Sequence, residues 1–134
     1  MTGAYSRYTS SSGGGSGAND DVLVAVEAAV AVADAVYLKS ADLYAKADAT
    51  AEATMPVAGF IVSKPSATTA LLRYAGDLGG FALVADTEYY AAKVAGQITA
   101  TPPDVAGNVV QGVGRAKNAT TLTIAVQDDD YTVI

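Results

Sequence analysis

The chain has 134 residues, of which 51% are hydrophobic, and it carries 8 Lys and Arg against 14 Asp and Glu, for a formal net charge of −6. It contains no Cys and no His, which excludes disulfides, thiol nucleophiles, thiolate metal sites and the commonest general base. This length predicts one domain. Its 28 Ala and 16 Val predict a core of small and β-branched side chains. Such a core buries little apolar surface, so we expect the domain to gain stability from partner subunits.

The distribution of charge and hydrophobicity argues against two classes of partner. The cations are scattered singly, whereas phosphate binding relies on clustered Lys and Arg, so we expect no nucleic-acid partner. No apolar run reaches the roughly 18 residues that a membrane helix needs, and the first residues lack the apolar region of a secretory signal. We therefore expect synthesis in the cytoplasm and no membrane partner.

Residues 1–21 differ in composition from the rest of the chain. A Gly/Ser tract at residues 10–17 predicts a flexible coil, and Tyr5, Arg7 and Tyr8 precede it. Tyr and Arg are enriched at interface hot spots, so we interpret these three residues as the tip of a docking arm, with a plain disordered tail as the alternative. The predicted organisation is thus a flexible N-terminal arm, residues 1–21, and a β-rich domain, residues 22–134.

The segment from Val22 to Val32 is the one place where helix and strand compete. It is rich in Ala, the best helix former, yet its valines all fall at even positions: 22, 24, 26, 30 and 32. A strand would place all these valines on one face, whereas a helix would scatter them around its axis. Because β-branched residues also suit a pleated surface, we predict a strand over residues 22–32.

Beyond this segment the sequence predicts short strands separated by turns. Residues 36–39 and 43–46 flank a hairpin loop at residues 40–42, and residues 48–54 form a loop or a brief helical turn. Further strands are predicted at residues 57–62, 69–74, 81–84, 88–92, 97–101, 109–113, 120–126 and 131–134, with a turn cluster at residues 76–80. This spacing predicts an all-β fold, either an antiparallel β-sandwich or a small β-barrel.

The acidic and glycine-rich motifs point to no chemistry. The triplet at residues 128–130 lacks the spaced oxygen ligands and glycine turn of a calcium loop, which favours a solvated turn. Gly112 and Gly114 lack the third glycine and following helix of a dinucleotide fingerprint, which favours a bulge or close packing in a strand. We predict no catalytic residue, no metal ligand and no cofactor, and an enzyme that uses carboxylates alone is the least favoured class.

Tyr89 and Tyr90 are adjacent within a predicted strand. Successive strand residues point to opposite faces, so one ring is expected in the core and the other outside. The outward ring is a candidate for a contact between subunits, and ordinary surface exposure is the alternative.

The order of several short signatures resembles small β-rich domains of tailed-bacteriophage structural proteins, namely capsid decoration (cement) proteins and head-fibre proteins. The resemblance covers residues 22–134 and depends on this pattern. The signatures lie at residues 36–39, 42–50, 56–59, 88–90, 96–103, 107–116 and 120–124. Similar modules occur in phage tail-fibre proteins.

The resemblance implies a mechanical role. Such proteins sit on the assembled capsid, often as trimers, and stabilise it or carry a projecting fibre. We therefore expect a virion protein on the capsid surface, with the major capsid protein as partner and a homotrimer as the favoured oligomer. The resemblance does not extend to the arm, and Tyr5, Arg7 and Tyr8 are expected to dock on the capsid because of their residue types. The alternative is a tail-fibre-like adhesion module that binds a host surface glycan or protein.

Overall fold

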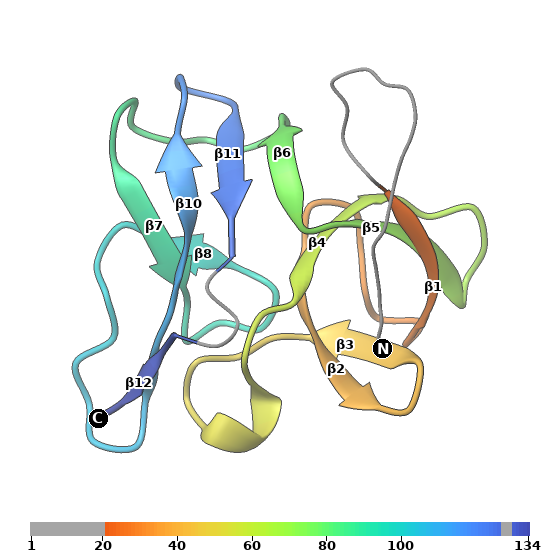
Figure 1. Ribbon diagram of the computed structural model, residues 1–134, viewed down its shortest axis with the longest axis horizontal. Coiled ribbons are helices and arrows are strands. Elements are labelled where there is room, and N and C mark those ends of the chain that lie inside the picture. Colours follow the sequence, from red (N-terminus) through yellow and green to blue (C-terminus); the bar gives the residue numbers. More distant parts are fainter. Residues whose placement is uncertain (1–20, 127–129) are drawn as a thin grey trace.

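The computed structural model describes residues 21–126 and 130–134, and within them the chain is all-β, as predicted. A closed five-stranded barrel lies on one side and a five-stranded sheet on the other (Figure 1). The prediction of a small β-barrel is therefore confirmed, with a packed sheet in addition. The predicted arm, except Asp21, and residues 128 and 129 lie outside the described residues.

The barrel closes in the order β1-β3-β2-β4-β5. Its strands are β1 (Val22–Val26), β2 (Ala35–Ser40), β3 (Leu43–Lys46), β4 (Gly59–Ser63) and β5 (Thr69–Arg73). A short 3₁₀ turn, η1 (Glu52–Thr54), precedes β4 and agrees with the predicted helical turn. All neighbours are antiparallel except β1 and β3, which run parallel through two residue pairs and close the barrel.

The second layer is an antiparallel sheet in the order β6-β11-β10-β7-β8. Its strands are β6 (Ala75–Leu78), β7 (Glu88–Ala91), β8 (Ile98–Thr99), β10 (Gly112–Ala116) and β11 (Leu122–Ala125). A two-stranded ladder, β9 (Val109–Val110) with β12 (Thr132–Val133), extends it at the lower left of Figure 1. Because β8 ends this order, one of its edges pairs with β7 and no described strand covers the other edge.

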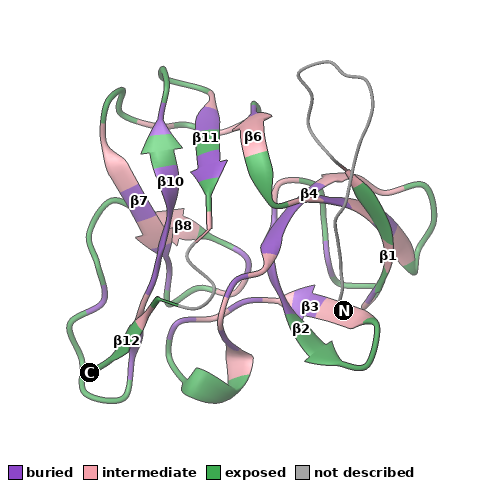
Figure 2. Ribbon diagram, viewed as in Figure 1, coloured by how far each residue is buried: buried purple, intermediate pink, exposed green. Residues whose placement is uncertain are grey.

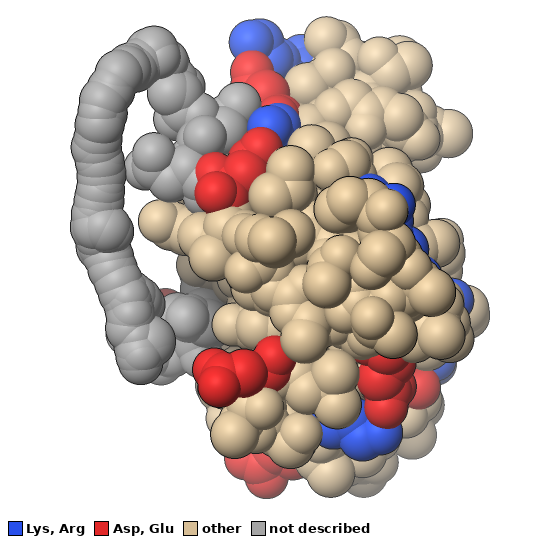
Figure 3. Space-filling view, turned by 90° about the vertical axis from the view of Figure 1, so that its right-hand side faces the viewer, with Lys and Arg blue, Asp and Glu red and all other residues tan. Residues whose placement is uncertain are grey.

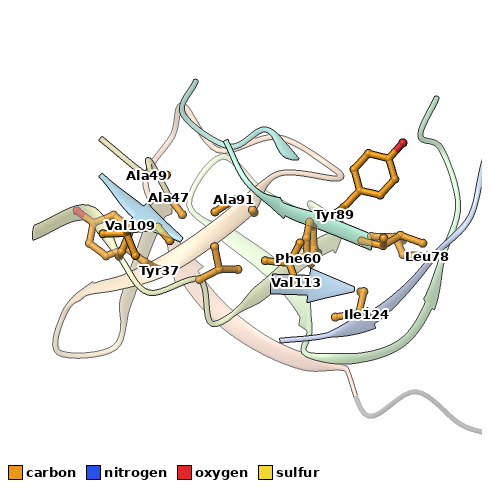
Figure 4. Close-up of a cluster of buried hydrophobic side chains, with 14 of the residues drawn as sticks. Tyr37, Ala47, Ala49, Phe60, Leu78, Tyr89, Ala91, Val109, Val113 and Ile124 are labelled. Atoms are coloured by element: carbon orange, nitrogen blue, oxygen red, sulfur yellow. The ribbon is translucent and has the colours of Figure 1, made fainter. Parts of the chain in front are cut away.

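Two hydrophobic cores share the strands of the barrel. The smaller core fills the barrel and contains Val26, Val30, Val36, Ile61, Ala70 and Leu72. The larger core lies between the barrel and the sheet (Figure 2), and Figure 4 shows Phe60 among its side chains. The ring centroids of Phe60 and Phe81 lie 6.0 Å apart, edge to face. Within β4, neighbouring residues serve different cores: Phe60 packs against the sheet, and Ile61 packs inside the barrel. β4 therefore has both of its faces buried at Phe60 and Ile61.

The predicted strand over residues 22–32 is wrong beyond Val26. The Val30 amide donates to the Glu27 carbonyl at 3.0 Å, which closes a turn, and Lys64 Nζ donates to the Val30 carbonyl at 2.6 Å. Val30 is only 2% exposed, so it is buried although it lies in a turn, whereas Val22 and Val32 are exposed at 45% and 55%. The chain leaves the strand here because it must cross from β1 to β2 to close the barrel.

The region from Gly76 to Val84 departs from prediction in two ways. Residues 76–78, predicted as part of a turn cluster, belong to β6, which pairs along its length with β11 and buries Leu78. Residues 81–84, predicted as a strand, form none. Their amides instead reach a turn, with Phe81 donating to the Thr120 carbonyl at 3.1 Å and Leu83 to the Ala119 carbonyl at 2.8 Å. Side-chain burial persists in this segment without a partner strand.

Two local predictions are confirmed. The hairpin of β2 and β3 turns through Ala41 and Asp42, with Asp42 in the left-handed region at φ 59. The paired glycines of β10 mark a bulge, since the register with β7 shifts between Gly112 and Gly114. A Cβ at Gly114 would lie 2.3 Å from the Thr123 carbonyl oxygen, so close strand packing requires glycine there.

Candidate functional site

The point where the predicted arm meets the barrel is fixed by an ion pair. Arg73, at the end of β5, donates from Nε and Nη2 to the two carboxylate oxygens of Asp21 at 2.8 and 2.9 Å. Its remaining nitrogen Nη1 donates to the Asp77 carbonyl on β6 at 2.6 Å. Side-chain exposures of 14% and 22% make this a partly buried, bidentate pair, the stronger kind of ion pair. Asp21 is therefore held beside Arg73, which in turn contacts β6.

An apolar surface continues from this ion pair along the outside of the barrel. The register of β1 with β5 pairs Leu23 with Leu71, and Ala25 with Thr69. On the other side of β1, Ala25 pairs with Leu43 of β3. The even positions Val26, Ala70 and Leu72 point into the barrel core, so these odd positions point outward. We call Leu23, Ala25, Leu43 and Leu71 the outer barrel row.

The outer barrel row is open to solvent. Leu23 is 62% exposed, Ala25 is exposed, and Leu43 and Leu71 are half-buried. Figure 3 views this side of the molecule: much of its middle is occupied by residues that are neither acidic nor basic, and charged residues lie mainly above and below. An exposed leucine alone is ordinary, but leucines paired across neighbouring strands form an apolar surface suited to a protein partner.

An exposed ion pair lies beyond the C-terminal end of β1. Lys39 Nζ donates to Glu27 Oε2, and this hydrogen bond, with the negative charge of Glu27, raises the pKa of Lys39 above 10.5. Both side chains are solvent-exposed, so this ion pair contributes little to the stability of the fold. It marks the edge of the outer barrel row.

The predicted tyrosine pair has one ring inside and one ring toward solvent, as strand alternation requires. Tyr89 is 6% exposed and belongs to the larger core, and its hydroxyl accepts a hydrogen bond from the Val84 amide at 2.9 Å. Tyr90 lies half-buried on the opposite face, paired with Gly112 on one side and Thr99 on the other. Only Tyr90 is therefore placed for a contact between subunits. Tyr5, Arg7 and Tyr8 lie outside the described residues.

The outer face of the sheet is polar, in contrast to the outer barrel row. A cross-strand row runs Glu88, Arg115, Thr123 and Asp77 through β7, β10, β11 and β6. Asp77 accepts hydrogen bonds from Lys117 Nζ at 2.7 Å and Thr123 Oγ1 at 2.8 Å. The hydrogen bond from Lys117 is the main reason, and that from Thr123 the second, why the pKa of Asp77 lies below 3.8. The hydrogen bond to Asp77 also raises the pKa of Lys117 above 10.5. The row is a set of local pairs, which stabilise one another without converging on a substrate position.

A groove is lined by residues of β8 and of the segments on either side of it. It encloses about 670 Å³, and its lining includes Val94, Ile98, Thr101, Pro102 and Asp104. Val94, which is 66% exposed, and the two prolines at 102 and 103 make the groove largely apolar. Lys93 and Asp104 add one positive and one negative charge to its lining. A largely apolar groove with a few polar groups is a candidate binding surface.

The buried acid Asp34 has a structural role. Its carboxylate accepts the Ala31 amide at 2.8 Å and lies 3.6 Å from Lys46 Nζ, while its side chain packs against Gly96. Over residues 21–126 and 130–134, no group of three or more His, Cys, Asp and Glu side chains is placed to hold a metal ion. In the same part of the chain, no helix has the length and apolar character needed to cross a membrane.

Sequence reasoning missed the outer barrel row and the groove. The signal for Leu23 was present, since it occupies the parity opposite to the valines of β1. Its pairing with Leu71 depends on barrel closure, and the groove depends on how the topology brings β8 together with residues 92–94 and 101–104. No protein-family model matches the chain, and no curated protein matches it either. The function must therefore be argued from these surfaces.

Proposed function

We propose that the chain is a structural protein of a bacteriophage virion, which binds the assembled capsid as a decoration, cement or head-fibre protein and stabilises it. The observation that carries the proposal is the outer barrel row, an uncharged apolar surface that begins two residues after the anchored Asp21. The order of the sequence signatures supports the same class of protein. The partner is the major capsid protein, and the favoured oligomer is a homotrimer.

The energetics of the domain support a role within a larger assembly. Much of its core is alanine, and the core residues of β3 and of the segment after it are Ala45, Ala47 and Ala49. Alanine forgoes about 0.8 kcal/mol for each methylene that a larger side chain would bury. Covering Leu23 and Leu71 in a lattice contact would contribute roughly 1.5–3 kcal/mol for each fully buried leucine. By mass action, copies bound to the shell are then more stable than free copies.

The arm provides a second contact with the shell. Tyr5, Arg7 and Tyr8 are residue types that dominate interface energies, and they are joined to the outer barrel row through the Gly/Ser tract and Asp21. Two linked contacts bind more tightly than either alone, because the second binding event takes place at a high effective concentration. Both the outer barrel row and the arm therefore contribute to the affinity for the capsid.

Co-sedimentation with expanded empty heads of the phage that encodes the chain tests the barrel contact. Leu23→Asp introduces a charge into the outer barrel row and should weaken binding at least about tenfold, which corresponds to about 1.4 kcal/mol. Val84→Asp is the matched control, because Val84 is 66% exposed, similar to Leu23, but lies in the segment before β7. Equal binding by Leu23→Asp and wild type would show that the outer barrel row does not contact the capsid.

Two further measurements test the role itself. Heads that carry the protein should disrupt at a higher temperature than bare heads, and deletion of residues 1–20 should reduce that gain. Imaging of intact particles should place the protein on the outer capsid surface, with three copies around a symmetry axis. Absence of the protein from purified particles would overturn the proposed function.

A further inference from the structure

We infer that a small pocket at the junction of the barrel and the sheet is a binding site for an arginine side chain of a partner protein. The pocket encloses about 290 Å³ and is lined by Tyr89 and by residues 32–34, 80–83 and 96–98. These three segments are the β1–β2 connection, the segment between β6 and β7, and the turn that leads into β8. Ligand pockets start at about 300 Å³, so this volume suits one side chain and not an extended ligand.

The pocket contains a buried carboxylate with one unused oxygen. Asp34 is 6% exposed, and its Oδ2 accepts the Ala31 amide at 2.8 Å and lies 3.6 Å from Lys46 Nζ. Oδ1 accepts no hydrogen bond from the described residues, and it is not one of their fully buried unpaired atoms, so it is accessible to solvent. Gly96 lines the pocket beside it, and a Cβ there would lie 2.9 Å from Oδ1. Because glycine adds no side chain at this point, a ligand in the pocket can reach the carboxylate.

Most of the backbone donors in the lining are already used within the protein. The amides that donate to carbonyl groups of the chain itself, at 2.7–3.1 Å, are those of Ala33, Asp34, Phe81, Leu83, Gly96 and Gln97. An anionic ligand would therefore find few donors and would face the carboxylate of Asp34. A ligand rich in hydrogen-bond donors fits instead, and a guanidinium group carries five of them together with a positive charge.

The other side chains of the lining suit the stem and the flat end of an arginine. Phe81 and Tyr89 supply aromatic rings, which attract and stack on guanidinium groups, and Val32 and Leu83 supply contacts for the methylene groups. Val32 is 55% exposed and Ala82 is exposed, so a side chain can enter from outside. A sugar would leave several of its hydroxyl groups unpaired against these apolar side chains. The net charge of −6 also favours the approach of a cation.

Lys46 provides a way to distinguish a cation site from a carboxylate with a structural role alone. Its ammonium group lies 3.6 Å from Asp34 Oδ2, which is longer than a hydrogen bond, and Lys46 does not line the pocket. It therefore offsets part of the charge of Asp34 without occupying Oδ1. An arginine in the pocket would compete with Lys46 for the same carboxylate, whereas a neutral ligand would not. Removing the charge of Lys46 should thus strengthen the binding of a cation.

NMR titration of the full-length protein with Nα-acetyl-arginine methylamide tests the inference. The matched probe is the citrulline analogue, in which a neutral group of similar shape replaces the guanidinium. The arginine probe should shift the amide signals of Ala33 and Gly96 with a Kd on the order of 1 mM, and the citrulline probe should bind at least about tenfold more weakly. Lys46→Met should tighten binding of the arginine probe at least about threefold, because Lys46 no longer competes for Asp34.

Asp34→Asn should abolish binding of the arginine probe, although it keeps an oxygen that can accept the Ala31 amide. Asp86→Asn is the control and should leave the Kd unchanged, because the Asp86 side chain is 93% exposed and lies outside the pocket. If Asp34→Asn does not fold, the citrulline probe and Lys46→Met decide. Equal binding of the two probes, or unchanged or weaker binding of the arginine probe by Lys46→Met, would overturn the inference. The assay contains no capsid, so it stands or fails separately from the proposed function.

Discussion

The side-chain amide of Gln111 pairs with the backbone of Val57 as if it were a neighbouring strand. Gln111 Oε1 accepts the Val57 amide at 2.7 Å, and Gln111 Nε2 donates to the Val57 carbonyl at 3.0 Å. Both residues are fully buried, and they are 54 positions apart in the chain. The pair joins the segment that enters β4 of the barrel to the segment between β9 and β10, at a place where no backbone ladder links them.

Replacing Gln111 by Leu should destabilise the protein by about 2–6 kcal/mol. Leucine fills a similar volume but leaves the buried Val57 amide and carbonyl without partners, and each such group costs about 1–3 kcal/mol. Urea unfolding measures the change. Gln97→Leu, at an exposed position, is the control and should alter the free energy of unfolding by less than about 0.5 kcal/mol. A neutral effect of Gln111→Leu would mean that the strand-like pair contributes nothing to stability.

Gly114→Ala should destabilise by about 1–3 kcal/mol or more, because the new methyl group would overlap the Thr123 carbonyl and force β10 and β11 apart. Gly79→Ala is the matched control, since a Cβ there comes no closer than 3.9 Å to its nearest neighbour. Thermal unfolding of the two variants separates the cost of close strand approach from the general effect of replacing glycine. Similar melting temperatures for both variants would contradict the close approach at β10.

Substitutions at Phe60 and Ile61 should report on the two cores separately. Phe60→Ala empties space between the barrel and the sheet and should cost about 3–5 kcal/mol, while Ile61→Ala empties the barrel and should cost about 2–5 kcal/mol. Because β4 serves both cores, each variant should keep one unfolding transition when followed by far-ultraviolet circular dichroism and by tyrosine fluorescence. Two separate transitions in either variant would show that the layers unfold independently.

The Asp77 carboxyl should titrate below 3.8, and Lys117→Met should raise its pKa toward that ordinary value. A carboxyl with a lowered pKa contributes stability that is present above the unfolded-state pKa and is lost as the pH falls through the folded-state pKa. The contribution of Asp77 should therefore disappear in acid below about pH 4. Carbon-detected NMR titration of the Asp77 side chain measures the value directly, and an unchanged pKa in Lys117→Met would refute the assignment to this hydrogen bond.

Much of the fold could be predicted from residue patterns. The even-numbered valines identified β1, and the turn residues around Asp42 identified the first hairpin. The same patterns gave wrong predictions where a side chain is buried but its backbone pairs with no other strand. Val30 is buried within a turn, and Phe81 packs in the larger core without a partner strand, so both resemble strand residues in the sequence alone. At Gly76 the composition predicts a turn, but pairing with β11 imposes a strand.

The candidate surfaces were less accessible to sequence reasoning, for a different reason. Leu23 and Leu71 are 48 positions apart, and only the β1–β5 register makes them neighbours. The groove brings β8 together with residues 92–94 and 101–104, and this arrangement depends on the whole topology. The outward position of one tyrosine was predictable, because in a strand one of the two adjacent rings must face outward. Which of them faces outward, Tyr90, was not predictable from the sequence.

The sharing of β4 between two interiors restricts how this protein can change over generations. A strand whose neighbouring side chains each fill a different interior has no face on which mutations can accumulate without a packing cost. A gene fragment that encoded the barrel alone would expose the wall on which Phe60 lies and leave Val57 without its amide partner. We therefore expect barrel and sheet to be inherited and exchanged as one piece, with sequence divergence concentrated in exposed turns outside the two cores and the outer barrel row.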